Sequence, residues 1–234
     1  MRKLMCVVLW LTFTGTALGA GQSKEAKRLE SAAYAVNEIM QAPEQGIPRS
    51  LLNRAVCVGV VPSELRLAFL FGASYGRGAL VCRKGGNGSW GAPSMFTLYG
   101  ANFGFQIGGK ATDIVFIVMN TAGVRKLLQT DVKLGVDASA AAGPVGRTAE
   151  GATDIQMHAE ILSYSRSRGL FAGVSLAGAM LKTDYGANFQ FYRHVYEPKE
   201  ILIDGVTAPP AEAKQLDDIL AQYSPRGGEP FPKA

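Results

Sequence analysis

The chain has 234 residues, of which 47% are hydrophobic and 18% charged, a composition that excludes a disordered chain and suits one folded domain. The formal net charge is only +5, and the Lys and Arg residues are scattered in ones and twos. A nucleic-acid binder would carry them in a concentrated stripe, so we expect no nucleic-acid partner, whereas weak attraction to anionic lipid is compatible with this charge.

The first nineteen residues have the pattern of a signal peptide. Arg2 and Lys3 form a basic start, residues 5–13 an apolar run, and residues 17–19 a small-x-small cleavage site. The apolar run is short of the ~20 residues that a spanning helix needs, which makes an N-terminal membrane anchor the weaker alternative. We therefore expect a signal peptide over 1–19 and an exported protein, periplasmic or secreted, that associates with membranes peripherally.

Two cysteines, Cys57 and Cys82, remain once the predicted leader is removed. In an oxidising compartment an even pair of cysteines is usually bonded. Both lie in strand-like runs on either side of a predicted hairpin, so two buried free thiols on neighbouring strands are an equal alternative.

Residues 20–234 are predicted to form one domain with a core over about 29–220 and a short polar tail over 224–234, since no linker-like stretch divides them. Residues 23–41 carry apolar side chains at helical spacing, and Pro43 and Gly46 end this helix. Glycine-rich turns then separate short β-branched runs, a pattern typical of an antiparallel meander. We expect a helix at 48–54; strands at 55–61, 65–71, 77–82, 94–99, 102–107 and 112–119; a helix at 121–130; strands at 155–165 and 170–175; a helix at 187–195; a strand at 200–203; and a helix at 210–223.

These elements predict an α+β fold, a single domain in which N-terminal and C-terminal helices pack against a largely antiparallel sheet or partly closed barrel. The apolar face of the first helix contains Leu29, Val36, Ile39 and Met40. We expect this face to pack on the sheet, as amphipathic helices of globular proteins usually do; insertion into a membrane is the alternative.

The glycines from Gly104 to Gly109, followed by Lys110, have the spacing of a phosphate-binding loop. The next residue is Ala111, where such loops have a magnesium-binding hydroxyl, and a strand follows rather than a helix. A glycine-rich hairpin is the better interpretation, and we expect no nucleotide or other cofactor.

Ser74 lies in a Gly-x-Ser-x-Gly pattern, and Ser175 lies in a pattern one residue short of it. A serine hydrolase needs a histidine base, and the chain has only His158 and His194. Asp154 with His158 is the nearest approach to a metal-ligand pair, and stable sites need three or four ligands. We therefore predict no catalytic residues and no metal site, with a serine hydrolase as a distant alternative.

Five stretches of the sequence, in this order, resemble the SYLF domain, a lipid-binding module of a yeast actin-patch regulator and of many exported bacterial proteins. The resemblance covers roughly 29–220. The stretches that carry it are Trp90–Ser94, Gly104–Gly109, Val132–Ser139, Ala142–Arg147 and Ile161–Leu176.

The resemblance implies a non-enzymatic protein that binds anionic lipid or phosphoinositide, with Lys24, Lys27 and Arg28 of the first helix as the membrane contact. Glutamates in the same helix weaken that attraction. Arg147, Arg166 and Arg168, near a stretch of very small side chains, are further candidates for binding a headgroup, although a solvated surface is their commoner state.

A protein-interaction or structural role in the cell envelope is the alternative to lipid binding, and it would use an exposed apolar patch and an envelope protein partner. Actin regulation is attached to the family through its yeast member. Because an exported protein does not meet actin in its own cell, we do not extend that role to this chain.

Overall fold

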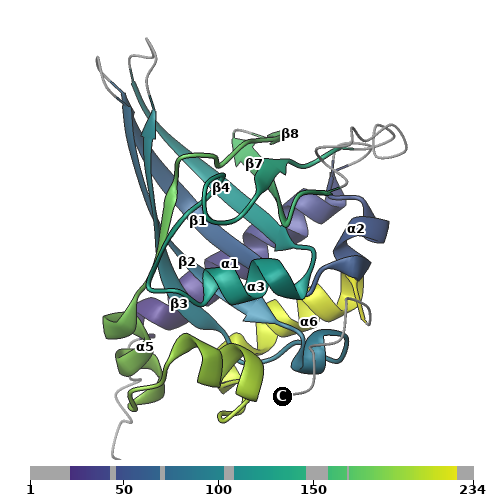
Figure 1. Ribbon diagram of the computed structural model, residues 1–234, viewed down its shortest axis with the longest axis vertical. Coiled ribbons are helices and arrows are strands. Elements are labelled where there is room, and N and C mark those ends of the chain that lie inside the picture. The colour runs from purple at the N-terminus through teal and green to yellow at the C-terminus, as the bar shows by residue number, and fades with distance from the viewer. Residues whose placement is uncertain are drawn as a thin grey trace, which may run out of the picture.

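Within the described residues, 22–42, 46–68, 72–102, 108–145, 158–167 and 169–225, nine strands form one curled sheet in the computed structural model of the protein, with helices on both faces (Figure 1). The predicted α+β class is confirmed. The strands are β1 (Cys57–Ala68), β2 (Gly72–Cys82), β3 (Ser94–Asn102), β4 (Gly108–Val118), β5 (Asp131–Lys133), β6 (Ala140–Ala142), β7 (Ile161–Ser167), β8 (Leu170–Gly173) and β9 (Met180–Thr183). The helices are α1 (Lys24–Gln41), α2 (Arg49–Arg54), α3 (Thr121–Leu127), α5 (Tyr185–Tyr192) and α6 (Lys214–Tyr223), with short turns η1 (Lys84–Gly86), η3 (Glu200–Asp204) and η4 (Ala211–Ala213).

The strands lie in the order β5-β9-β3-β2-β1-β4-β7-β6, with β8 beside β7. The pairs are antiparallel except β6 with β7, which is parallel. The predicted meander is correct for β1, β2 and β3 but wrong for β4, which pairs with β1 rather than with β3. β1 takes a central place because residues 57–61 are buried from both faces of the sheet.

Local predictions failed where elements are short. The strand predicted at 200–203 is wrong, because Glu200–Asp204 form the π-helical turn η3, which ends at Gly205 with a left-handed φ of 62°. β5, β6 and β9 were missed, since three or four residues are too few to show alternation. The strand predicted at 155–165 begins at Ile161, and residues 103–107 and 151–157 lie outside the described residues.

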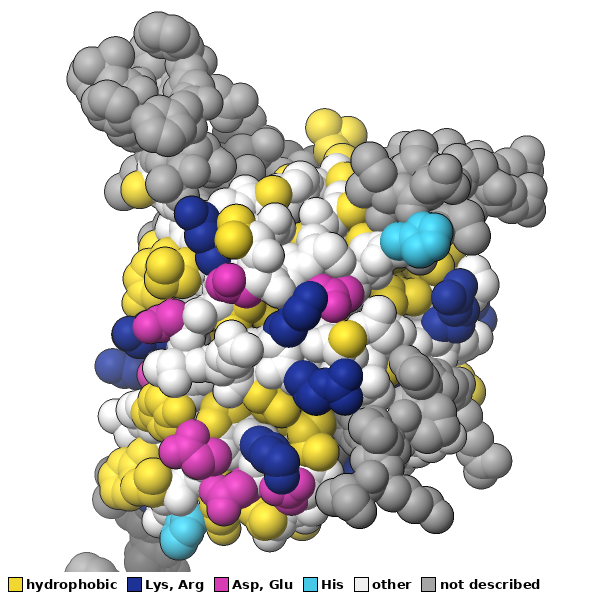
Figure 2. All heavy atoms as spheres, in the orientation of Figure 1, with side chains coloured by type: hydrophobic (Ala, Val, Ile, Leu, Met, Phe, Trp, Pro, Cys, Tyr) yellow, Lys and Arg dark blue, Asp and Glu magenta, His cyan; other side chains and the backbone are white. Residues whose placement is uncertain are grey.

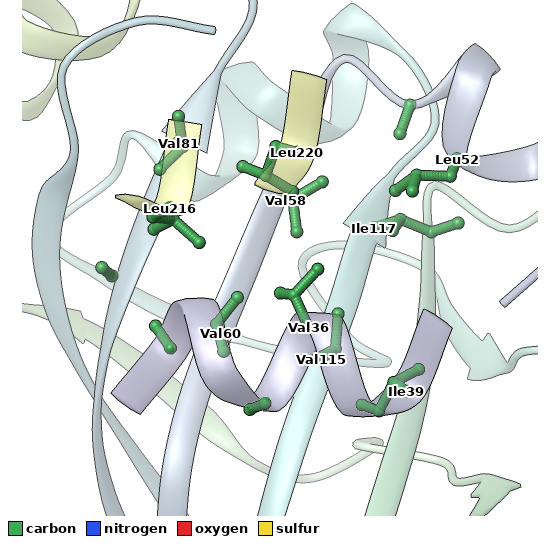
Figure 3. Packing of buried hydrophobic residues seen from close by; sticks show 14 of the residues in the cluster. Val36, Ile39, Leu52, Val58, Val60, Val81, Val115, Ile117, Leu216 and Leu220 are labelled. Atoms are coloured by element: carbon green, nitrogen blue, oxygen red, sulfur yellow. The ribbon is translucent and has the colours of Figure 1, made fainter. Parts of the chain in front are cut away.

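Helix α1 lies across one face of the sheet, with α6 beside it. Ser23 caps its start, its hydroxyl accepting a hydrogen bond from the Ala26 amide at 3.0 Å. Leu29, Val36 and Ile39 are at most 1% exposed, and burying each contributes roughly 1.5–3 kcal/mol. The first helix therefore packs on the sheet as predicted. Figure 3 shows this cluster, in which Val36, Ile39, Leu52, Leu216 and Leu220 of the helices meet Val58, Val60, Val81, Val115 and Ile117 of the sheet.

The opposite face of the sheet carries a second apolar cluster, closed by α3 and the segments around β5 and β9. Phe96 and Phe116 meet there edge to face, with ring centroids 5.6 Å apart. Their rings lie directly over Gly59 and Gly78, where a Cβ atom would come within 2.1 Å and 2.5 Å of ring carbons. These two glycines therefore make room for the rings.

Cys57 and Cys82 are direct partners in the β1–β2 register, and a disulfide joins them. Both side chains are buried, at 0% and 1% exposed. Of the two alternatives left open by the sequence, the structure has the bonded pair.

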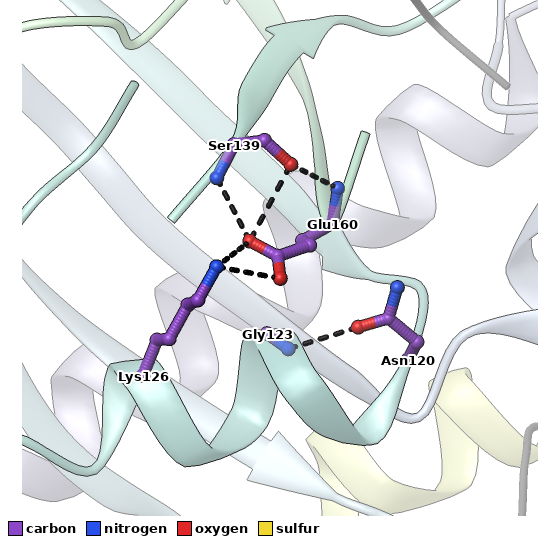
Figure 4. A network of polar contacts seen from close by, with 5 residues as sticks. All are labelled: Asn120, Gly123, Lys126, Ser139 and Glu160. Carbon is purple, nitrogen blue, oxygen red and sulfur yellow. Dashed lines mark hydrogen bonds and ion pairs between the residues drawn. The ribbon is translucent and has the colours of Figure 1, made fainter. Parts of the chain in front are cut away.

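A polar network anchors α3 to the strand ends beside it (Figure 4). Lys126 donates to both carboxylate oxygens of Glu160 at 2.7 Å, and the Ser139 amide donates to the same carboxylate at 2.9 Å. Burial raises the pKa of Glu160, but these bonds outweigh it and lower the pKa overall. Since the carboxylate is fully occupied, we regard this cluster as structural.

Candidate anion-binding site

A bulge in β1 opens a groove between α1 and the sheet. The register of β1 with β4 shifts between Val61 and Glu64. Ser63, at this bulge, has a left-handed φ of 55°, and its amide donates to the Asp113 carboxylate at 2.9 Å. The groove consists of two pockets that share Ser31 of α1 with Pro62 and Ser63 of the bulge.

The first pocket, of about 310 Å³, is cationic. Its lining includes Lys27 and Arg28 of α1 together with Tyr75 and Arg77 of β2. Residues 75 and 77 face the same side of the sheet because side chains alternate along a strand, and α1 covers that side. The pocket therefore collects three cations from two elements.

Arg28 is the most constrained of these cations. It is only 8% exposed, and its Nη1 atom is buried with no hydrogen-bond partner among the described residues. The nearest carboxylate oxygen, Oδ2 of Asp184, lies 3.6 Å from Nη1, which is an ion pair but too long for a hydrogen bond. Burial lowers the pKa of Arg28, Asp184 opposes this, and the neighbouring charge of Arg77 lowers it further.

The other two cations are exposed. Arg77 donates from Nε to the Tyr75 hydroxyl at 2.8 Å, and this hydrogen bond raises the pKa of Arg77. Within the described part of the chain, neither Lys27 nor Arg77 forms an ion pair. An anion in the pocket would offset the repulsion between the guanidinium groups of Arg28 and Arg77.

The second pocket, of about 420 Å³, is not cationic, because its arginine is already paired. Arg166 donates to Asp113 at 2.9 Å and to Glu38 at 2.8 Å, and it lies over the ring of Tyr34. Burial would lower the pKa of Arg166, but the bond to Asp113 and the neighbouring carboxylates raise it overall. Arg166 thus ties α1 to β4 and β7.

The residues predicted to bind lipid do not form one site. Lys24 and Lys27 lie exposed on α1, and Lys27 lines the cationic pocket with Arg28. Arg166 belongs to the paired pocket beside it. Arg147 and Arg168 lie outside the described residues.

Membrane insertion by the apolar face of α1, the alternative to the expected packing on the sheet, is contradicted by the structure. Leu29, Val36 and Ile39 are buried against the sheet, and Met40 packs on the same core. Exposing these side chains would forfeit roughly 1.5–3 kcal/mol each. Tyr75 and Arg77 were not predicted as site residues, because the strand predicted from residue 77 left Tyr75 in a turn, whereas β2 begins at Gly72 and includes both.

The serine motifs lack the geometry of a nucleophile elbow, and residues 104–107 of the glycine motif lie outside the described residues. Ser74 is 7% exposed near the start of β2, which runs on without the strand-to-helix turn of a nucleophile elbow. The Ser175 hydroxyl accepts from the Ala177 amide at 3.2 Å, and His194 lies against Tyr196. Lys110 lies in β4, which continues as a strand to Val118 instead of opening a helix at this point.

Two further kinds of site are absent from the described ranges. No group of three or more His, Cys, Asp or Glu side chains there is placed to hold a metal ion. None of the helices built from those residues has the length and apolar character needed to cross a bilayer. On the face shown in Figure 2, cationic and acidic side chains are interspersed rather than gathered into a stripe.

Comparison with known proteins identifies a family. The family model Ysc84, described as Las17-binding protein actin regulator, matches residues 99–223. LAS seventeen-binding protein 3 of Saccharomyces cerevisiae is 34% identical over 213 residues, covering 88% of this chain and 46% of its own. Protein YSC84 of the same yeast is 35% identical over 193 residues, with coverage of 81% and 41%. The human SH3 domain-containing YSC84-like protein 1 is 33% identical over 203 residues, with coverage of 86% and 58%.

The chain thus spans about half the length of the curated relatives it matches. One of these names describes a binding protein, the family model is described as an actin regulator, and none of the three names states a catalysed reaction.

Proposed function

The chain belongs to the Ysc84/SYLF family, and from this premise we propose that it is a non-enzymatic protein that binds anionic lipid headgroups at a membrane surface. The family resemblance that the sequence suggested is thereby confirmed. The binding site in this proposal is the cationic pocket between α1 and β2.

The proposal rests mainly on the guanidinium group of Arg28, which is buried and has one nitrogen without a partner among the described residues. A buried guanidinium group with one nitrogen unsatisfied costs stability, because the lost hydration is not fully replaced. Arg77 and Lys27 add two exposed cations to the same pocket. A phosphate group in the pocket would be attracted by all three cations, and arginine suits phosphate because its planar group can donate two parallel bonds.

The binding test is co-sedimentation of the chain from Ala20 onward with phosphatidylcholine vesicles that contain a minority of phosphatidylglycerol or of a phosphatidylinositol phosphate. We expect binding at low salt that falls as salt is added. Absence of binding to both anionic compositions at low salt would contradict the proposal.

Arg77→Ala tests the pocket, with Arg125→Ala as the matched control. Arg125 lies exposed on α3, which packs on the other face of the sheet, and its loss changes net charge by the same amount. A basic residue at an anionic surface is worth about 1 kcal/mol, so Arg77→Ala should weaken binding about fivefold and Arg125→Ala should leave it unchanged. Equal losses in both variants would mean that overall charge, not the pocket, attracts the vesicles.

Export is part of the same proposal. If residues 1–19 are removed as a leader, the protein recovered from outside the cytoplasm should begin at Ala20, which N-terminal sequencing would establish. An uncleaved N-terminus in that fraction would contradict it.

The relatives' names favour a second candidate, binding of a protein partner, since the family model is described as Las17-binding. Crosslinking in intact cells distinguishes the two: a partner retained by Arg77→Ala while vesicle binding is lost would assign the domain a separate protein-binding surface.

A further inference from the structure

A row of exposed side chains runs from the cationic pocket across three neighbouring strands. Tyr75 of β2 lies opposite Tyr99 of β3, and Tyr99 lies opposite Met180 of β9. Their exposed fractions are 39%, 42% and 42%, although each is a large, mainly apolar side chain. The two tyrosine rings meet edge to face with centroids 5.4 Å apart, so the row is continuous.

Cations lie in the next row on the same side of the sheet. Two residues further along each strand, Arg77 lies opposite Thr97, and Thr97 lies opposite Lys182. Lys182 has only a long 3.5 Å ion pair with Asp131, and both side chains are about half exposed. Lys133 of β5, which is also exposed, lies opposite Met180 at the end of the apolar row.

We infer that the row formed by Tyr75, Tyr99 and Met180 is the surface that contacts an anionic bilayer and sets the orientation of the protein on it. This inference rests on the proposed lipid binding and adds the contact with the membrane interior. Tyrosine suits the interface, because its ring enters the apolar region while its hydroxyl stays among the headgroups. The flanking cations then face anionic headgroups.

The size of the row favours a membrane over a protein partner. A stable protein interface uses about 20–30 residues on each side, whereas a peripheral contact needs only a few interfacial side chains beside cations. Tyr75 also joins the row to the pocket, since it lines the pocket and accepts the hydrogen bond of Arg77. A headgroup held in the pocket would bring its acyl chains next to the row.

The test combines Tyr99→Ser with Met180→Ser, neither of which lines the pocket. The control is Leu170→Ser, an apolar residue that is 74% exposed on β8, beside β7 on the other side of the sheet. We expect the double variant to partition into anionic vesicles about tenfold more weakly, and the control to partition like wild type. Binding of a water-soluble deacylated phosphoinositide headgroup, measured by calorimetry, should be unchanged in both. Thermal denaturation must show that the double variant is folded.

A second measurement does not depend on loss of binding. Vesicles with brominated acyl chains should quench the fluorescence of the tryptophan in Tyr99→Trp at least about twofold more than that in Leu170→Trp. Only the tryptophan at position 99 would enter the bilayer. The unsubstituted chain from Ala20 onward, which keeps Trp90, supplies the baseline.

The two proposals fail separately. Unchanged vesicle binding by the double variant, or equal quenching at positions 99 and 170, would overturn the inference and leave the pocket intact. Quenching of Tyr99→Trp without any binding of the soluble headgroup would support the row and overturn the pocket. Loss of a crosslinked protein partner by the double variant, with vesicle binding unchanged, would assign the row to that partner instead.

Discussion

Arg83 donates from Nη2 to both the carbonyl and the hydroxyl oxygen of Ser224, which is 141 residues later in the chain. Its Nε donates to the Ala55 carbonyl at 3.0 Å, and the guanidinium lies 4.0 Å from the centroid of the Trp90 ring. Arg83 is 0% exposed and has no carboxylate partner among the described residues, and burial lowers its pKa to about 10. One cation therefore fastens the end of α6 to the start of β1.

Arg83→Ala should destabilise the fold strongly. The substitution leaves buried carbonyl groups without donors and opens a cavity beside Trp90, for an expected loss of about 3–5 kcal/mol in the free energy of unfolding. Urea denaturation would measure it, with the exposed Arg125→Ala as a control that should change stability by less than about 0.5 kcal/mol. A loss in Arg83→Ala no larger than in the control would show that the network is dispensable.

Arg28→Met should separate stability from binding. Methionine fills a similar volume without a buried charge, so we expect the free energy of unfolding to be unchanged or raised by about 1 kcal/mol. Vesicle binding should fall at the same time, because the pocket loses its buried donor. The prediction is checked by denaturation and co-sedimentation on one preparation. Strong destabilisation would instead assign Arg28 a structural role through Asp184.

Gly59→Ala tests the seating of the aromatic rings on the sheet. A Cβ at this position would lie 2.1 Å from Cζ of Phe116, so the buried ring must move, which we expect to cost about 1–3 kcal/mol. Gly186→Ala in α5 is the matched control, since its Cβ meets only the Asp184 side chain at 3.7 Å. Alanine is also the better helix former, so the control should gain up to about 1 kcal/mol. Equal effects on the melting temperature would contradict this account.

Asp217→Asn should change how stability depends on pH. Burial, and to a lesser extent Asp218, raises the pKa of Asp217 from 3.8 to about 7, and its Oδ1 atom has no hydrogen-bond partner. The folded state thus keeps a proton that the unfolded state releases, and this group's contribution to stability is lost as pH rises from about 4 to about 7.

Asparagine stays neutral, so Asp217→Asn should be more stable than wild type at about pH 8, by on the order of 1 kcal/mol after allowance for solvent screening, and equal to it near pH 4. Melting temperatures at both pH values would show this. Asp218→Asn is the control, since Asp218 is exposed and paired with Lys214, and it should show no gain at high pH. A gain for Asp217→Asn that is the same at both pH values would contradict the titration.

The parts of the fold that sequence patterns predicted are those set by neighbouring residues. The apolar spacing of Leu29, Val36 and Ile39 correctly placed α1 on the sheet, and β-branched runs located β1 and β4. The pairing of β4 with β1 was not predictable, because it depends on which strand buries both faces rather than on any local turn.

The candidate site depended even more on distant residues. Lys27 and Arg28 were identified from the helix, but Asp184 lies more than 150 residues away from Arg28 in the chain, and only the fold brings it within 3.6 Å. Arg166 was also identified as a cation, yet its pairing with Glu38 and Asp113 was hidden for the same reason. Patterns in the sequence could therefore name the charges but not their partners.

The oxidation state of the Cys57–Cys82 pair indicates whether a given molecule has left the cytosol. Cytosolic thiols are kept reduced, whereas those of exported proteins become oxidised. Because both sulfur-bearing side chains are shielded from solvent, the native chain should exchange slowly with added thiols once it is extracted. The proportion of oxidised chains in a rapidly alkylated cell extract would then report how much of the protein has left the cytosol.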